Sequence, residues 1–393
     1  MNGAGVLHLG LRYLARHRAK ATLLVLAFSL AAFLPVSLSR IIAQVEETLR
    51  SRAVDTDLVL GHAGSALELT FNALYFTKPE IETVPYGEVA ELNQSGLAVA
   101  IPLYARFSAG AHRIVGTNLD YFHFRDFSYE QGRALLHLGE CVVGAEVADA
   151  NDISVGDAVI SSPESLFDLA GVYPLKMRVC GVLERTGTAD DRAIFVDVKT
   201  AWIIEGLGHG HEDASELPDD QRLGEEKDGA IRLNASIREY NEITPDNADQ
   251  FHFHGDEADL PLTAVIVDPF DAKGQALLKG RYAARSDRQL IVPQEEMDEL
   301  FATVFQVRSA VLAMLIAVGV GTLLLGVIVF LLSYRLRKDE FRHLRNLGAS
   351  PGTLRALIGF EAGFVILASL LLSIAALWLV GRITPWMLER VLG

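Results

Sequence analysis

The sequence contains little cysteine, and its basic residues are outnumbered by acidic ones. Its 393 residues include 2 cysteines, and 35 Lys and Arg stand against 50 Asp and Glu, for a formal net charge of −15. Because an acidic surface repels polyphosphates, this charge balance argues against a nucleic-acid partner. An acidic surface that only keeps the protein soluble is an equally good explanation of the charge itself.

The motifs of several enzyme classes are also absent. There is no G-x-x-x-x-G-K-[ST] pattern, so the chain has no ATP-binding loop of its own. There is no G-x-S-x-G and no H-E-x-x-H pattern, which mark hydrolase nucleophiles and zinc proteases. We therefore predict that the chain is not an enzyme.

Charge is missing altogether from three long stretches, residues 21–39, 309–334 and 362–380. A helix of about 20 apolar residues crosses the hydrocarbon core of a bilayer. We predict three membrane helices, at 21–43, 305–334 and 356–382. The first resembles a signal peptide in its basic flank, but its apolar core is long and no A-x-A site follows, which favours an uncleaved anchor.

The distribution of Lys and Arg predicts the orientation. Residues 1–20 carry four basic residues and no acid, and residues 335–355 carry six basic residues against Asp339 and Glu340. Basic loops stay in the cytoplasm. Residues 44–304 and the tail 383–393 are then periplasmic. Each cytoplasmic segment carries +4 and residues 356–393 cancel, which leaves −23 for the remainder, essentially the periplasmic domain. Residues 1–20 also suit a short helix in the membrane interface, in contact with lipids.

The periplasmic segment reads as a mixed α+β domain. Apolar strand-like runs occur at 97–107, 112–118, 139–160 and 177–204, and residues 262–293 read as a β-α-β unit. Both cysteines, Cys141 and Cys180, lie in such runs, where a buried free thiol is common, although an oxidising compartment also permits a disulfide. We predict three membrane helices with a large α+β periplasmic domain inserted between the first and the second.

Residues 205–259 form a polar insertion around one candidate strand, 231–239. The insertion contains HGHED (209–213) and FHFHGDE (251–257), and alternate residues of an extended chain share a side. Imidazole and carboxylate groups are zinc ligands, so we predict a zinc site, with a polar loop that merely contains histidine as the alternative. The candidate ligands are His209, His211, His252, His254, Glu212, Asp213, Asp256 and Glu257.

Residues 339–362 read as a short amphipathic helix followed by a second helix. Asp339 and Glu340 favour the positive end of a helix, and Gly348 favours its termination. Leu344 and Leu347 give the helix an apolar edge. Such a helix between two spans is suited to docking on another protein, and an ordinary inter-span loop is the alternative. We predict that Glu340, Leu344, Leu347 and Gly348 couple the chain to a cytoplasmic partner.

Four segments resemble the MacB/FtsX-type ABC transporter permeases, a group that includes the lipoprotein-releasing permeases. The coupling segment is the most specific, because charges, Leu-Gly-Ala and a following acid recur in fixed order. The segments are DLVLGHAGSALELTFNALYF (57–76), VVGAEVADANDISVGDAV (142–159), VCGVLERTGTADDRAIFVD (179–197) and DEFRHLRNLGASPGTLRALIGFEA (339–362).

The resemblance implies a multi-pass protein of the bacterial inner membrane that works as a homodimer, or with a similar permease, on a cytoplasmic ATPase dimer. ATP binding would rock the spans and move the periplasmic domains, a process termed mechanotransmission, with a periplasmic adaptor or binding protein as a further partner. We carry three hypotheses for the role: zinc homeostasis, export or release of lipoprotein, lipid or peptide with incidental histidines, and regulation of a periplasmic hydrolase.

The family has a fourth span after the third, whereas this chain ends eleven residues after Arg382. Those eleven residues are too few to cross a membrane. We expect either that the helix has been lost or that the sequence is truncated. A missing fourth span would alter the packing of the dimer more than the coupling to the ATPase.

Overall fold

The computed structural model describes residues 3–77, 80–162, 174–210, 222–225, 231–233, 241–244, 247–253 and 255–391. The chain forms two compact units. The membrane unit comprises Met1–Glu47 and Leu300–Leu392, and the outer domain comprises Thr48–Glu299.

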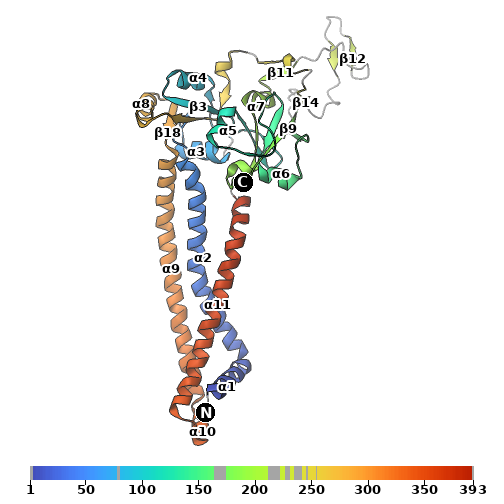
Figure 1. The fold of residues 1–393 in the computed structure, drawn as a ribbon. Helices are drawn as coiled ribbons and strands as arrows, with labels where there is room; N and C mark the ends of the chain where they lie inside the picture. The colour runs from blue at the N-terminus through green and yellow to red at the C-terminus, as the bar shows by residue number, and fades with distance from the viewer. Residues whose placement is uncertain are drawn as a thin grey trace. The chain divides into compact units, whose positions relative to one another are not determined.

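The membrane unit is helical (Figure 1). Three of its helices are long and apolar enough to cross a membrane, with candidate spans Arg18–Val54, Pro293–Leu336 and Pro351–Thr384, which confirms the predicted number of spans. The helices extend beyond the predicted spans, and the last continues through most of the segment expected as a tail. The helices are α1 (Gly3–Arg16), α2 (Arg18–Val54), α9 (Pro293–Leu336), α10 (Lys338–Asn346) and α11 (Pro351–Val391).

One sheet of the outer domain is built from four strands in the order β18-β1-β17-β3, with every neighbouring pair antiparallel. The predicted β-α-β unit at 262–293 is present as β17, α8 and β18, but β1 lies between its two strands. The elements are β1 (Leu58–His62), α3 (Ala66–Tyr75), α4 (Gly87–Gln94), β3 (Ala98–Leu103), β17 (Ala264–Pro269), α8 (Ala272–Tyr282) and β18 (Arg288–Ile291).

The second sheet is mixed. Its main path runs β14-β9-β7-β10-β5-β4, and β6 and β8 also pair with β9. The strands are β4 (Ser108–Ala109), β5 (His112–Thr117), β6 (Tyr129–Gly132), β7 (Glu140–Val143), β8 (Ala158–Ile160), β9 (Leu175–Leu183), β10 (Ala193–Asp197) and β14 (Asn241–Glu242). The helices beside them are α5 (Leu119–Phe124), α6 (Ala145–Asn151), the 3-10 helix η1 (Ala189–Arg192) and α7 (Val198–Glu205).

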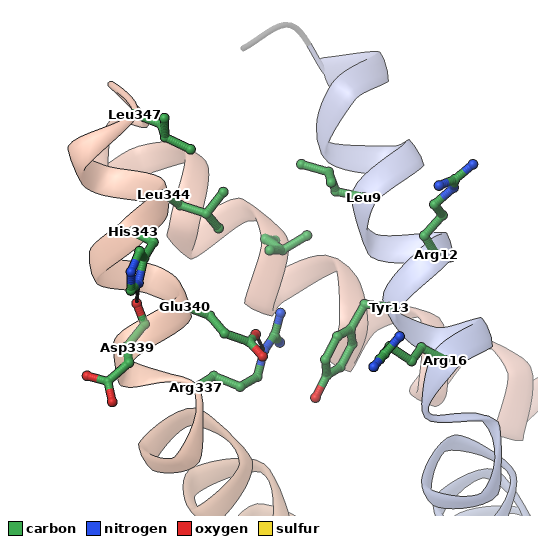
Figure 2. A pocket seen from close by; sticks show the side chains of 11 residues that line it. Leu9, Arg12, Tyr13, Arg16, Arg337, Asp339, Glu340, His343, Leu344 and Leu347 are labelled. Atoms are coloured by element: carbon green, nitrogen blue, oxygen red, sulfur yellow. Dashed lines mark hydrogen bonds and ion pairs between the residues drawn. The ribbon is translucent and has the colours of Figure 1, made fainter.

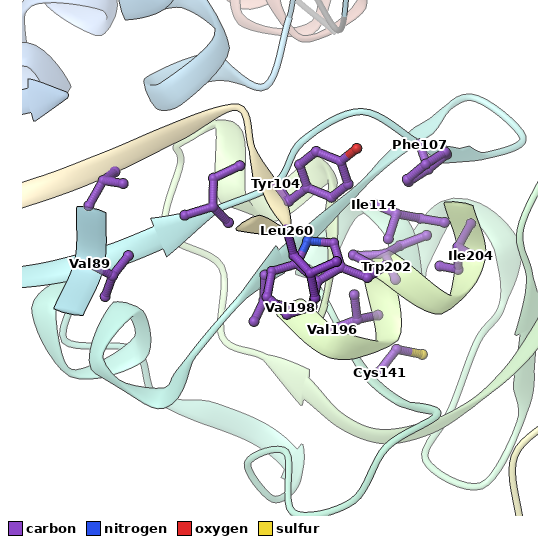
Figure 3. Close-up of a cluster of buried hydrophobic side chains, with 14 of the residues drawn as sticks. Val89, Tyr104, Phe107, Ile114, Cys141, Val196, Val198, Trp202, Ile204 and Leu260 are labelled. Carbon is purple, nitrogen blue, oxygen red and sulfur yellow. The ribbon is translucent and has the colours of Figure 1, made fainter. Parts of the chain in front are cut away.

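Two clusters of buried apolar side chains form the core of the outer domain. One contains Trp202 (Figure 3). Its indole Nε1 donates to the carbonyl of Pro261 at 2.7 Å. The other centres on Tyr121 and Phe195. Cys141 packs in the first cluster and Cys180 in the second, and both thiols are free, which confirms the interpretation of buried free cysteines.

The polar insertion has more regular structure than the sequence predicts. β11 (Gly208–Gly210) pairs with β15 (Phe251–Phe253), and β12 (Arg222–Glu225) pairs with β13 (Ile231–Leu233). The candidate strand at 231–239 is therefore three residues long as far as the structure describes it. The short strands β2 (Val84–Pro85) and β16 (Pro261–Leu262) pair with each other. The 3-10 helices η3 (Ala248–Gln250) and η4 (Glu257–Asp259) precede and follow β15 in the chain.

Candidate functional site

A groove with a volume of about 590 Å³ lies between α1 and α10 in the membrane unit (Figure 2). Leu344 and Leu347, two of the residues predicted to couple to a partner, face this groove. The lining residues are Leu9, Arg12, Tyr13, Arg16, Arg337, Asp339, Glu340, His343, Leu344, Leu347 and Leu357.

The helix α10 begins with acidic residues and ends before a left-handed glycine. Asp339 and Glu340 lie in its first turn, where the helix dipole favours negative charge. Gly348 has a φ of 91°, a conformation that costs a residue with a Cβ about 1–2 kcal/mol. Phe341 is buried, whereas Leu347 is 85% exposed. The helix thus buries one aromatic anchor and leaves a large apolar side chain without packing inside the described chain.

Arg337, just before α10, fixes the position of this helix. Its Nη1 donates to Glu361 of α11 at 2.7 Å, and its Nε donates to Glu340 at 3.1 Å. Its guanidinium carbon lies 3.6 Å from the centre of the Tyr13 ring of α1. Glu361 is 4% exposed, so its charge requires this partner. Arg337 thereby connects α1, α10 and α11 at the groove.

Nothing in the sequence marks Arg337 for this role beyond its positive charge, and Glu361 stands there only as an acid at the end of the coupling segment. An arginine and a glutamate 24 positions apart carry no spacing signal, because neither the i, i+3 nor the i, i+4 rule applies. The i, i+3 pair of Arg337 with Glu340 was the only available sign.

The wall of the groove on α1 is basic. Arg12 and Arg16 line it, one helical turn apart, and Leu9 and Tyr13 complete the α1 wall (Figure 2). Arg12 and Arg16 are exposed. The groove therefore combines apolar contact area with positive charge on α1 and acidic side chains at the start of α10.

The predicted metal ligands are distributed over a separate region, in the outer domain. β11 and β15 are antiparallel, with His209 directly opposite His252. The structure therefore joins one histidine of each pair, which the sequence alone did not predict.

The remaining predicted metal ligands are tied elsewhere or lie outside the described residues. Asp256 accepts a hydrogen bond from the Ala258 N–H at 2.9 Å, and Glu257 lies 2.8 Å from Lys199 Nζ. Within the residues that the structure describes, no three His, Cys, Asp or Glu side chains are grouped to hold a metal ion. The predicted ligands that lie outside the described residues are His211, Glu212, Asp213 and His254.

Comparisons with known proteins identify the family. The family model of the MacB-like periplasmic core domain matches residues 22–236. The periplasmic region of MacB from Actinobacillus actinomycetemcomitans is similar at 13% identity and a TM-score of 0.36, covering 66% of this chain and 96% of that one. The extracellular domain of the noncanonic ABC-type transporter YknZ from Gram-positive bacteria is similar at 10% identity and a TM-score of 0.32, covering 60% and 98%.

A search of curated proteins found no match. The family model, however, spans more than half of the chain and includes most of the outer domain. The three candidate spans and the mixed α/β domain between the first two agree with it. The chain belongs to the MacB/FtsX-type ABC transporter permeases, as a membrane protein with a MacB-like extracytoplasmic domain.

Proposed function

We propose that this permease is a mechanotransmission subunit, in which a separate cytoplasmic ATPase drives movements of the outer domain. Leu347 carries the proposal: it is 85% exposed at the C-cap of α10, the helix that joins two membrane spans. An apolar side chain in such a position gains stability only when a partner covers it. The chain has no ATP-binding loop, so the nucleotide must be bound by that partner.

The contacts that hold α10 on the neighbouring helices allow a force on α10 to reach the membrane spans. Phe341 is buried and stacks near Tyr334, with ring centres 5.6 Å apart. Arg337 joins the start of α10 to Glu361 on α11. A partner that moves α10 therefore moves the ends of two spans, and not a loose loop. The ATPase acts on the groove through Glu340, Leu344, Leu347 and Gly348.

Affinity purification of the tagged chain from bacterial inner membranes tests this proposal. We expect an ATP-binding subunit to co-purify, in the stoichiometry of a permease homodimer with an ATPase dimer. A similar permease or a periplasmic adaptor in the preparation would define a heteromeric complex. If the chain purifies without any nucleotide-binding protein, and its membranes show no ATPase activity attributable to it, the proposal is wrong.

A role in zinc homeostasis is a second candidate, supported by the cross-strand pair of His209 and His252. Two imidazoles on one face of a strand pair provide half of a tetrahedral zinc site. His211 and His254, each two residues further along the sequence from this pair, supply further nitrogen ligands in the proposal. Because only neutral imidazole binds metal, affinity should fall below about pH 6.5.

Calorimetric zinc titration of the full chain separates this role from the others. Replacing His209, His211, His252 and His254 by alanine should remove the tight site. The control replaces two other histidines of the outer domain, His123 and His137, and should leave it intact. Equal zinc affinity in the quadruple variant would leave lipoprotein, lipid or peptide export, or control of a periplasmic hydrolase, as the role.

A further inference from the structure

The end of α2 enters the outer domain and carries a buried arginine there. Arg52 is 5% exposed, and its guanidinium donates to both carboxylate oxygens of Asp190 in η1. Its Nη2 also donates to the hydroxyl of Tyr121 in α5 at 2.8 Å. Tyr121 in turn donates to Asp190 at 2.8 Å. The three side chains close a ring of hydrogen bonds between α2, here called the stalk helix, and two elements of the domain, α5 and η1.

Further contacts surround this ring. The hydroxyl of Tyr75 in α3 donates to the carbonyl of Leu49 in α2. Thr56, two residues beyond α2, donates its hydroxyl to the carbonyl of Arg52 at 3.1 Å and accepts from Arg125 Nη2 at 3.0 Å. Three separate elements of the domain, α3, α5 and η1, thus hold the end of one helix.

The chemistry of the ring is better suited to fixing geometry than to adding stability. Burial disfavours ionisation of Asp190, but the charge of Arg52 outweighs it and holds the pKa of Asp190 below its ordinary value. The Nε of Arg52 is buried without a hydrogen-bond partner among the described residues. Buried ion pairs of this kind are often no more stable than apolar side chains of the same size. A bidentate arginine–carboxylate pair, however, fixes both the distance between the two side chains and their relative rotation.

We propose that Arg52, Tyr121 and Asp190 form a stalk joint that fixes the rotation of α2 relative to the outer domain, so that movement of the helix becomes movement of the domain. This inference rests on the proposed mechanotransmission. Arg52 and Asp190 are positioning residues, because they set the angle at which the helix meets the domain. Without the ring, the hydrogen bond from Tyr75 to the Leu49 carbonyl and the apolar contacts of the buried Leu49 and Ala53 would still hold the end of α2, but no bidentate contact would fix its rotation.

The test compares two double variants of the full chain in complex with its ATPase in nanodiscs. R52M/D190N removes both charges of the ring together, so that neither Arg52 nor Asp190 is left buried without the other, and Arg125 keeps its hydrogen bond to Thr56. The control, R133M/E140Q, removes another bidentate arginine–carboxylate pair, which joins Arg133 and Glu140 inside the outer domain and includes no residue of α2. Thermal unfolding of both variants shows whether they are equally destabilised.

Spin labels report on the joint directly. One label pair, at R40C and L277C, measures the distance between α2 and the domain; both positions are exposed, and Arg40 follows the proline of α2. A second pair, at R382C and L277C, measures movement of the domain relative to α11. Labelled chains are diluted with unlabelled ones so that each complex carries one pair. The two native cysteines are buried and react slowly.

In the wild-type chain, the α2–domain distance should be narrow and unchanged between the nucleotide-free and the ATP–vanadate states, while the α11–domain distance shifts. In R52M/D190N, the α2–domain distribution should broaden at least twofold and the α11–domain shift should fall at least twofold. The control variant should behave as wild type. If R52M/D190N does not fold, R52K, which keeps the charge but loses the two-pronged geometry, should show intermediate values.

The two possible failures are distinguishable. Wild-type behaviour of R52M/D190N, or of R52K in its place, would overturn the stalk joint and leave mechanotransmission standing. A wild-type chain whose α11–domain distance does not respond to ATP and vanadate would overturn mechanotransmission and the joint together.

Discussion

Replacement of Leu344 in α10 and of Leu347 at its C-cap by aspartate gives the sharpest prediction for the coupling groove. The variant L344D/L347D should lose its cytoplasmic ATPase, because both side chains face the groove and a partner must bury them. The fold of the membrane unit should survive, since Leu347 is 85% exposed and Phe341, which anchors α10, is unchanged.

The expected magnitude follows from the exposure of each side chain. Full burial of a leucine contributes about 1.5–3 kcal/mol. Leu347 offers nearly all of this to a partner, and Leu344, which is mostly buried, offers at most about a third. The loss is then about 1.5–3.5 kcal/mol, before the cost of burying two carboxylates is added. At about 1.4 kcal/mol for each factor of ten, affinity should fall roughly 10- to 300-fold.

The assay titrates the purified ATPase onto the chain in nanodiscs and measures the dissociation constant of the complex. N346D is the matched control, because Asn346 is exposed on the same helix and the change adds the same negative charge as one leucine replacement. We expect less than a threefold effect from this control. An L344D/L347D variant that binds within threefold of wild type would show that α10 is not the docking helix.

Three further predictions concern other parts of the chain. A reporter fused after Gly393 should read periplasmic, and a cytoplasmic signal would contradict the orientation with three spans. Burial disfavours the charge of Glu140, but the guanidinium of Arg133 and two backbone N–H groups outweigh it and lower the pKa to about 2. A lowered folded-state pKa stabilises above the unfolded value, so this contribution should be complete above about pH 4.5 and lost towards pH 2. The side chain of Arg133 is 44% exposed, so solvent screening limits the contribution of this pair to the free energy of unfolding to about 1–2 kcal/mol. In denaturant unfolding, E140Q should abolish the pH dependence of stability in this window. Burial raises the pKa of Cys180 to about 11 and raises that of Cys141, so neither thiol should react with maleimide at pH 7 without denaturant, and rapid labelling would contradict their burial.

The stalk joint shows why some functional residues escape sequence reading. Arg52 and Asp190 are 138 positions apart, and each sits in a segment of ordinary composition. The resemblance to the family covered the segment that contains Asp190, but nothing in that segment indicated a buried partner. Similarly, Arg337 and Glu361 meet only because α9, α10 and α11 pack together.

The sequence alone determined the membrane class, the number of candidate spans, the mixed α/β domain between the first two, and the short amphipathic helix after the second. These features depend on composition and on the local periods of apolar residues, which are set within about 20 positions. Tertiary structure decided how β1 separates β17 from β18, how His209 meets His252, which clusters hold the two cysteines, and how Arg52 reaches Asp190. Each of these depends on contacts between distant segments, because strand register and buried charge pairing are fixed only when the whole core closes around them.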